Sequence, residues 1–237
     1  MQEKIRPPVE NQILAALPKK KYGQLLSNLE LVSLSLNQVL HQSGQTIRYV
    51  YFPNGGMVSL LASRDGNSKS VEVGFSGNEG VVGLSAFLGD EVAQHRAIVQ
   101  LEGSAMRIPV EIFKQAANRP GPLQDMLHRC AQTLLIQVSR ATFCNCFHKV
   151  DARLARWLLI TQDYARSDRF PMTHEFISHM LGARRSGVTI SAVALKNEAL
   201  IRYTRGTITI LDRQRLEAAS CDCYQFIKAA RARLFGA

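Results

Sequence analysis

The sequence predicts an α+β protein with three parts: an N-terminal β-sandwich or roll, a long α-helix and a C-terminal winged helix-turn-helix. Three observations support this class. Across residues 29–109, short apolar or alternating runs are separated by turn signals, as in closely spaced strands. After Pro120-Gly121, apolar residues recur at alternating spacings of four and three, which is typical of a helix with one buried seam. Across residues 173–211, two helical patterns flank Gly182 and an alternating hairpin pattern follows.

The N-terminal part is expected to begin with two short helices in residues 11–28, broken by Pro18, because proline cannot continue a helix. Strands follow as separate runs, such as YVYFPNGG and MVSLLAS, then HRAIVQLEG and SAMRIP. Asp65-Gly66 stands between MVSLLAS and SKSVEV and is a strong hairpin signal. Many short strands at close spacing indicate a sandwich or roll.

The long helix spans about 25 residues, and its apolar seam has two interpretations. The helix lies on its own domain, or it pairs with its twin in a dimer, and the spacing favours the dimer. The predicted dimer-helix residues are Leu123, Leu127, Cys130, Leu134, Gln137 and Ala141, and Cys144 continues the seam. A second amphipathic helix begins at Val150, with Leu154, Trp157, Leu158 and Thr161 on one face.

A pair of short helices follows. Thr173 is the expected N-cap of the first, with Glu175 in the first turn, and Gly182 supplies the break between the two. The buried face of the first helix is predicted to hold Phe176, Ile177, Met180 and Leu181. The second helix is expected from Arg184 or Arg185 to Lys196, with Val188, Ala192 and Leu195 pointing inward.

The outer face of the second helix carries little charge apart from its arginines, and its side chains suit a DNA major groove. Arginine reads guanine edges or phosphates, serine and threonine make polar contacts, and an aliphatic group meets a thymine methyl. Gly187 lowers helix stability by up to about 1 kcal/mol relative to alanine, and close approach of the preceding helix or of a DNA backbone would explain why glycine is tolerated there. The predicted DNA-contact residues are Thr173, His174, Arg184, Arg185, Ser186, Thr189, Ile190 and Arg205, with Val193 also on the outer face.

The stretch after this helix alternates as a hairpin. Ile201, Tyr203, Ile208 and Ile210 face one way, and Arg202, Thr204, Thr207 and Thr209 face the other. Gly206 permits the turn and Arg205 stands at its tip. Two helices about a glycine turn and then a hairpin make a winged helix-turn-helix, in which one element enters a groove and the other clamps a phosphate.

The charge distribution agrees with an anionic partner. The net charge is +10, and residues 147–237 hold 15 Lys+Arg against 8 Asp+Glu, whereas residues 1–146 hold 14 against 11. The +7 of the shorter C-terminal part favours nucleic acid first and a membrane surface second.

The five cysteines are Cys130, Cys144, Cys146, Cys221 and Cys223. Their odd number argues against a disulfide framework, and the C-x-C spacings differ from the C-x-x-C of a zinc finger. Cys144, Cys146 and His148 offer three metal ligands, but small buried residues are the commoner fate of free cysteines such as Cys130 and Cys144. No metal is predicted.

The chain resembles the Crp/Fnr family of bacterial transcriptional regulators over nearly its whole length. YVYFPNGGMVSLLA and SVEVGFSGNEGVVGLSAFLG are similar to the family's β-roll sensor, RLARWLL to the start of its DNA-binding domain, FISHMLGARRSGVT to its helix-turn-helix and LIRYTRGTITILD to its wing. The resemblance implies a cyclic-nucleotide-binding-like sensor in residues 1–120, folded as a double-stranded β-helix (a jelly roll or β-roll), a dimerisation helix and hinge in 121–148 and a DNA-binding domain in 149–237. It also implies a homodimer on a palindromic operator, with base reading at Arg185, Ser186 and Ile190. Ile190 stands where regulators of the catabolite-activator type have arginine, so we do not assume that this protein recognises the same operator sequence.

The effector pocket that the resemblance implies is degenerate at Gly83, Leu84, His95 and Arg96. Family members that bind cyclic AMP hold the ribose with a Gly-Glu pair and the phosphate with an Arg-Ser/Thr-Ala run. Here Leu84 follows Gly83, and His95 stands at the arginine position, while Arg96 is one residue along and faces the other side of a strand. Charge-assisted bonds of this kind contribute about 1.5–3 kcal/mol each, so cyclic AMP is not expected to bind. No cofactor is predicted: no cysteine precedes Cys130 to hold an N-terminal iron–sulfur cluster, and nothing singles out His41, His95 or His128 for haem.

The expected partners are double-stranded DNA, a second copy of the chain and, for an activator, RNA polymerase. No membrane contact is expected and the cytoplasm is the predicted location, because no apolar run reaches about 18 residues and MQEKIRPPVENQ lacks a signal-peptide core. One alternative is a regulator gated by another small molecule or by thiol redox or metal chemistry at Cys144 and Cys146. Another is an enzyme, which is disfavoured because His41 and His95 are too far apart for a cupin motif and no nucleophile or paired-carboxylate motif is present. A non-DNA-binding β-roll scaffold is disfavoured by Arg184-Arg185 in the second helix of the pair.

Overall fold

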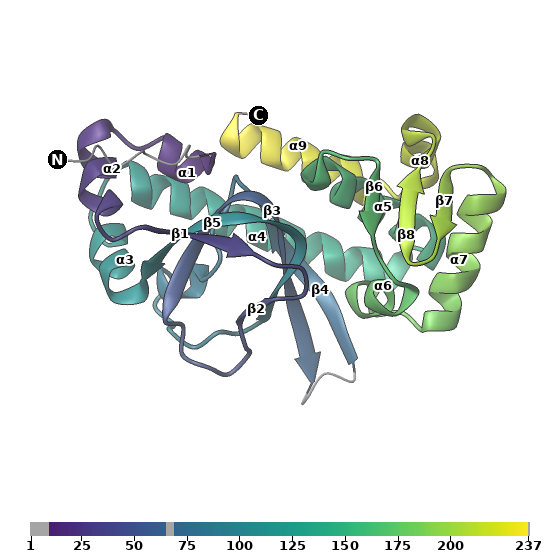
Figure 1. Ribbon diagram of the computed structural model, residues 1–237, viewed down its shortest axis with the longest axis horizontal. Coiled ribbons are helices and arrows are strands. Elements are labelled where there is room, and N and C mark those ends of the chain that lie inside the picture. The colour runs from purple at the N-terminus through teal and green to yellow at the C-terminus, as the bar shows by residue number, and fades with distance from the viewer. Residues whose placement is uncertain (1–9, 65–68, 237) are drawn as a thin grey trace. The chain divides into compact units, whose positions relative to one another are not determined.

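The protein, described as a computed structural model for residues 10–64 and 69–236, has a β-rich N-terminal part and a helical C-terminal part (Figure 1). The chain forms two compact units. The first comprises Met1–Val58 and Ser76–Ala131, and the second comprises Ser59–Phe75 and Gln132–Ala237. The predicted α+β class, with a β-rich N-terminal domain and a C-terminal helix-turn-helix, is confirmed. The boundaries expected at residues 120 and 148 stay a prediction.

The first unit opens with the two predicted short helices, α1 (Gln12–Ala15) and α2 (Lys19–Leu26). Pro18 stands at the N-cap of α2, so the predicted break is confirmed. Asn11 caps α1, because its side-chain oxygen accepts hydrogen bonds from the backbone N–H groups of Ile13 and Leu14. Its amide also donates to the carbonyl of Pro53 at 2.9 Å, which fixes the helix on the following strands.

The N-terminal sheet has five strands in the order β1-β5-β3-β4, with β2 also paired to β5. The strands are β1 (Glu30–Leu34), β2 (Val39–His41), β3 (Tyr49–Arg64), β4 (Lys69–Ser76) and β5 (Arg96–Pro109). β1 runs antiparallel to β5, from Glu30 opposite Arg107 to Leu34 opposite Gly103. A 3-10 turn, η2 (Leu84–Ala86), precedes β5, and α3 (Val110–Ala117) follows it. The predicted Asp65-Gly66 turn lies outside the described residues.

The expected division of this region into short strands is wrong at two places. β3 and β5 each continue through the glycines where the runs YVYFPNGG and HRAIVQLEG were expected to end. These glycines mark close approach of two backbones: a Cβ on Gly103 would collide with the backbone of Gly55, and one on Gly56 would lie 2.5 Å from the carbonyl oxygen of Leu101. Glycine in a strand can therefore signal a close crossing as well as an end.

The second unit is mainly helical. Besides the last residues of β3 and most of β4, it contains the C-terminal part of α4 (Pro122–Phe147), α5 (Val150–Ala165), β6 (Arg169–Pro171), α6 (His174–Leu181), α7 (Arg185–Asn197), β7 (Ile201–Thr204), β8 (Thr207–Ile210), α8 (Arg213–Ala219) and α9 (Cys223–Phe235). β6, β8 and β7 form a small antiparallel sheet in that order. None of the helices in the described part of the chain has the length and apolar character that a bilayer span needs.

α5 is more deeply buried than its amphipathic pattern predicts. The predicted face of Leu154, Trp157, Leu158 and Thr161 is buried, which confirms that interpretation. The other faces are covered too, because α6, α7, α8 and α9 all contact α5. Arg153 and Arg156 are each only 7% exposed. Arg153 donates hydrogen bonds to the side-chain oxygen of Asn145, at 2.6 Å, and to the carbonyl of Leu181.

α4 is the long helix that the sequence predicts, and the residues of its apolar seam contact other segments of the same chain. In the first unit Leu123, Leu127 and Cys130 are buried, and the Cys130 thiol lies 3.8 Å from the carbonyl oxygen of Glu79. In the second unit the side-chain oxygen of Gln137 accepts a 2.8 Å hydrogen bond from the N–H of Phe75. Ala141 is also buried, and Leu134 is partly exposed and lies beside Gly74. These contacts support the interpretation of a helix lying on its own chain, and a dimer role for the six seam residues stays a prediction.

Candidate nucleic-acid interface

The first helix of the pair is defined by its two caps. The hydroxyl of Thr173 accepts a 3.1 Å hydrogen bond from the N–H of Phe176, as expected of the predicted N-cap. Gly182 ends α6 in the left-handed region with φ 57°, and its N–H donates to the carbonyl of Ser178. Phe176 is only partly buried, whereas Ile177, Met180 and Leu181 form the predicted core face. The helix–glycine–helix interpretation is confirmed.

α7 separates its residues into a core face and an outer face. Val188, Ala192 and Leu195 are at most 4% exposed, as predicted. The exposed residues on and before the helix include five of the predicted DNA-contact residues: Arg184, Arg185, Ser186, Thr189 and Ile190. Ile190 is 71% exposed and Val193 is 48% exposed. Two neighbouring aliphatic side chains next to two arginines form an outer surface suited to both base edges and thymine methyl groups.

No close packing within the described residues explains why α7 has a glycine at position 187. A Cβ added there would meet no described atom within 4 Å. The close approach of a neighbouring helix, one of the two explanations from sequence, is therefore not seen within the described residues. The other explanation from sequence, close approach of a DNA backbone, stays a prediction.

His174 and Thr189 are brought together as a pair that joins α6 to α7. The Thr189 hydroxyl donates to the carbonyl of Arg185 at 3.0 Å, and Nδ1 of His174 lies 3.0 Å from the same hydroxyl oxygen. Because the hydroxyl has one hydrogen, this geometry assigns the ring hydrogen to Nδ1. The ring stacks on Tyr203 at a centroid distance of 4.3 Å. Burial, with a smaller contribution from the charge of Arg185, lowers the pKa of His174, so the ring is neutral at pH 7.

The hairpin that follows places its basic tip beside this helix pair (Figure 1). Arg205 and Gly206 have φ values of 46° and 76°, the positive pair that a tight type I′ turn requires. Arg205 is exposed at the tip. The N–H of Met172 donates to the carbonyl of Gly206 at 2.8 Å, which holds the turn near the start of α6. Inward burial of Ile201, Ile208 and Ile210 confirms the predicted alternation, and Tyr203 on the same face is half-buried against His174.

The predicted effector positions lie in the first unit. Gly83 has φ 99° and caps η2, and Leu84 after it is buried. A Cβ on Gly83 would lie 3.0 Å from the ring of His41, so a protein side chain occupies the space beside this glycine. Burial lowers the pKa of His95, which leaves its ring uncharged at neutral pH and unable to replace a guanidinium opposite a phosphate. Arg96 is partly buried.

The cysteine alternative is changed by the structure. Cys146 is exposed, whereas Cys144 is buried beside Cys221 and Cys223, far along the sequence. The hydrogen bond between Cys144 and Cys221 lowers the pKa of Cys144 and raises that of Cys221. Sequence reasoning missed Cys221 and Cys223 as partners of Cys144. Their C-x-C spacing was the available signal, but spacing does not show which distant residues meet.

Comparisons with known proteins agree with this architecture. Residues 31–119 match the cyclic nucleotide-binding domain, and residues 152–219 match the Crp-like helix-turn-helix domain. No curated protein sequence matches at a significant level.

Solved structures share the fold at low identity. A protein described as a transcriptional regulator of the Crp/Fnr family from Eubacterium rectale is 20% identical, with a TM-score of 0.70 over 90% of this chain and 97% of that one. The c-di-GMP-responsive regulator CLP of Xanthomonas campestris is 13% identical, with a TM-score of 0.68 over 82% and 100% of the two chains. A Crp/Fnr-family regulator from Thermus thermophilus is 21% identical, with a TM-score of 0.68 over 81% and 98%. Together with the order of the two matched domains, the winged helix-turn-helix shows that the chain belongs to the Crp/Fnr family of DNA-binding transcriptional regulators.

Proposed function

We propose that the protein binds a palindromic operator as a homodimer, with α7 of each subunit in a major groove and the tip of the β7–β8 hairpin on a neighbouring phosphate. The observation that carries this proposal is the outer face of α7. Its aliphatic residues Ile190 and Val193 are exposed on a helix that begins with two exposed arginines, and the hairpin that follows carries an exposed arginine at its tip. A solvated helix face normally holds more charge, whereas a base-reading face needs this mixture.

Each predicted contact then has a role set by its position. Arg185, Ser186 and Ile190 stand on the first turns of α7 and read base edges. Arg184 and the first N–H groups of α7 bind phosphate, because Arg184 caps the helix without a side-chain hydrogen bond and the helix dipole favours an anion there. Thr173 keeps α6 in place as its N-cap.

His174 and Thr189 keep α6, α7 and the hairpin in position and do not themselves read bases. The Thr189 hydroxyl donates its hydrogen to the carbonyl of Arg185 and accepts one from Nδ1 of His174, so a single acceptor lone pair remains for an outside partner. His174 contacts that hydroxyl and stacks on Tyr203, so it fixes the angle between α7 and the hairpin.

For the dimer, we infer a role for the face of α4 that the chain leaves open. Leu135 is 62% exposed, Phe143 41% and Phe147 73%, while the seam predicted for the dimer contacts the same chain. A second copy of α4 would cover these side chains and set the spacing of the two α7 helices at about 34–36 Å.

The sensor domain is inferred to respond to a ligand other than cyclic AMP, or to none. The buried Leu84 offers no acceptor to a ribose, and the neutral His95 offers no charge to a cyclic phosphate. We further infer a regulator that catalyses no reaction, acts in the cytoplasm on DNA and, where it activates, contacts RNA polymerase.

The proposal is tested by selecting bound fragments from random DNA with the purified full-length chain. The expected product is an inverted repeat with half-site centres about 10–10.5 base pairs apart or a multiple of that spacing. Arg185→Ala should weaken binding by about 1–3 kcal/mol and relax the preference at one position of each half-site. Arg119→Ala, which removes an equal exposed charge from the first unit, is the matched control. An unchanged sequence preference in Arg185→Ala would contradict the assignment of α7 as the reading helix.

A further inference from the structure

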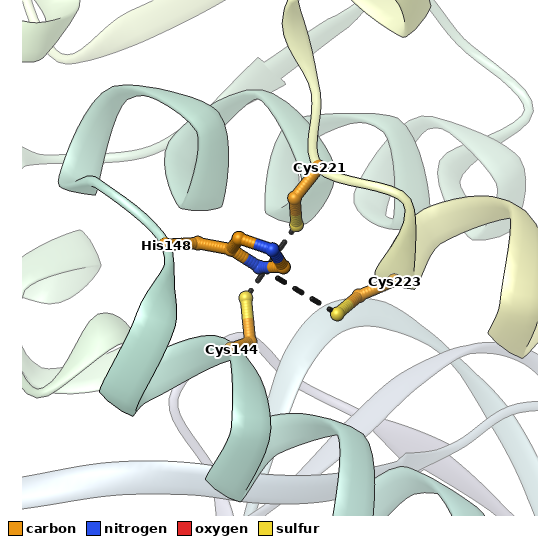
Figure 2. Close-up of side chains that lie close together, drawn as sticks. All are labelled: Cys144, His148, Cys221 and Cys223. Carbon is orange, nitrogen blue, oxygen red and sulfur yellow. Dashed lines mark hydrogen bonds between the residues drawn. The ribbon is translucent and has the colours of Figure 1, made fainter.

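Four side chains from three parts of the second unit point at one another where α4 ends (Figure 2). Cys144 and His148 come from the last turn of α4 and the residue after it, and Cys221 and Cys223 come from the junction of α8 and α9. Their ligand atoms, three sulfurs and an imidazole nitrogen, all lie within 4.8 Å of one another. We propose that these four residues bind one structural Zn²⁺ ion.

The distances match the edges of a zinc tetrahedron. Zn–S bonds of about 2.3 Å and Zn–N bonds of about 2.0–2.1 Å place neighbouring ligand atoms about 3.5–3.8 Å apart. Cys144 Sγ lies 3.5 Å from Cys221 Sγ, and Cys223 Sγ lies 3.7 Å from Nδ1 of His148. The widest separation has to shrink by about 1 Å, which small side-chain rotations supply.

The backbone positions of the ligands favour the same site. Cys144 and His148 are four residues apart, so a helical turn puts them on one face. Cys221 and Cys223 flank the residue that precedes α9. Two closely spaced ligand pairs brought together from distant segments are typical of closed structural zinc sites, and three soft thiolates with one imidazole form a ligand set that suits Zn²⁺.

Residues around the four ligands supply the surroundings that a zinc site needs. Nε2 of His148 lies 3.5 Å from a carboxylate oxygen of Asp222, which orients the ring with Nδ1 toward the sulfurs. Three thiolates and Zn²⁺ carry a net charge of −1. Arg156 is 7% exposed, and its positive charge acts on all three cysteines, so it balances that charge.

The site has a structural consequence within the second unit. It ties the end of α4, the short link to α5 and the start of α9 to one point. All four coordination positions belong to the protein, so no position stays open for catalysis. The ion therefore fixes the segment that joins the long helix to the DNA-binding helices.

Metal content of the purified full-length chain, measured without DNA, tests the proposal independently of DNA binding. About one zinc per chain should survive dialysis, and Co²⁺ added to the metal-free protein should give the visible and sulfur-to-cobalt absorption bands of a tetrahedral thiolate site. Cys223→Ser should lose the ion, whereas Cys146→Ser, an exposed cysteine two residues from Cys144, should keep it. His148→Cys should retain the ion with four thiolates. Asp222→Asn should bind zinc about 10- to 100-fold more weakly, because it loses the partner of the His148 ring.

Three results would overturn the zinc assignment. One is a metal-free protein that gives no cobalt spectrum, a measurement that needs no variant and so is independent of folding defects. Another is equal metal loss in Cys146→Ser and Cys223→Ser. The third is a Cys144–Cys221 disulfide, detected by mass spectrometry in protein purified without reductant. Such a bond would show that these two cysteines form a redox pair and do not bind a metal ion. An operator-binding protein that fails these tests would lose only the zinc assignment, and a zinc-loaded protein that binds no DNA would lose only the proposed function.

Discussion

Helices α5 and α7 pack against each other, yet they depart from simple hydropathy in opposite directions. α7 leaves Ile190 and Val193 exposed, and α5 buries Arg153 and Arg156. The buried guanidinium of Arg153 has partners within the chain, the side chain of Asn145 and the carbonyl of Leu181. The exposed apolar groups of α7 have no comparable cover in the described residues. A polar residue inside therefore points to a bond within the molecule, and an apolar residue outside points to a partner beyond it.

The largest expected effect comes from removing the hydrogen bonds of the buried Arg153 in α5. Arg153→Leu removes the two hydrogen bonds to Asn145 and Leu181 and leaves a buried carbonyl without its donor. Because each hydrogen bond from a charged donor contributes about 1.5–3 kcal/mol, the free energy of unfolding should fall by about 3–6 kcal/mol. Chemical denaturation measures this change. Arg184→Leu, at an exposed position, should stay within about 0.5 kcal/mol of wild type, and an equal loss in both variants would contradict the distinction.

A somewhat smaller effect is expected at Glu72, which is buried next to α5. Burial raises its pKa from 4.5 to about 7, against the opposing effects of the Ser59 hydroxyl and the charge of Arg156. The folded protein therefore holds a proton that the unfolded chain releases between these two values. Stability from this group is complete below about pH 4.5 and is lost as pH rises to about 7, a decrease of about 3 kcal/mol.

Denaturation at a series of pH values checks the Glu72 prediction. Glu72→Gln keeps the shape and stays neutral, so its stability should lack this decrease between pH 4.5 and 7. A variant with the same slope as wild type would show that another group is responsible.

Local sequence patterns predicted the helix-turn-helix well and the long-range contacts poorly. Thr173, Gly182 and the Arg205-Gly206 turn were found because caps and tight turns depend on neighbouring residues. The close approach of Gly103 to Gly55 was not predicted. The sequence alone does not show which distant backbone lies next to a glycine, so the glycine was interpreted as the end of a strand.

The seam of α4 shows a second limit of sequence patterns. Its spacing identified which face is buried, and the burial of Leu127 and Gln137 agrees. The spacing does not tell whether the covering surface belongs to the same chain or to a second copy. In the same way, the meeting of Cys144 with Cys221 across 77 residues depends on the complete fold.

The smallest expected effect is on DNA affinity and comes from Arg205, an exposed residue at the tip of the β7–β8 hairpin. Arg205→Asn removes the charge but keeps a residue that accepts a positive φ, so the hairpin turn should survive. Because a phosphate contact carries no sequence information, affinity should fall by a similar factor on every DNA sequence. The dependence of log affinity on log salt should become shallower by about 1.8 for a dimer that loses two such contacts. Binding measured at several salt concentrations on the selected operator and on unrelated DNA tests this. If Arg205→Asn instead altered the preferred sequence and left the salt dependence unchanged, the hairpin would be reading bases, and its separation in role from α7 would not hold.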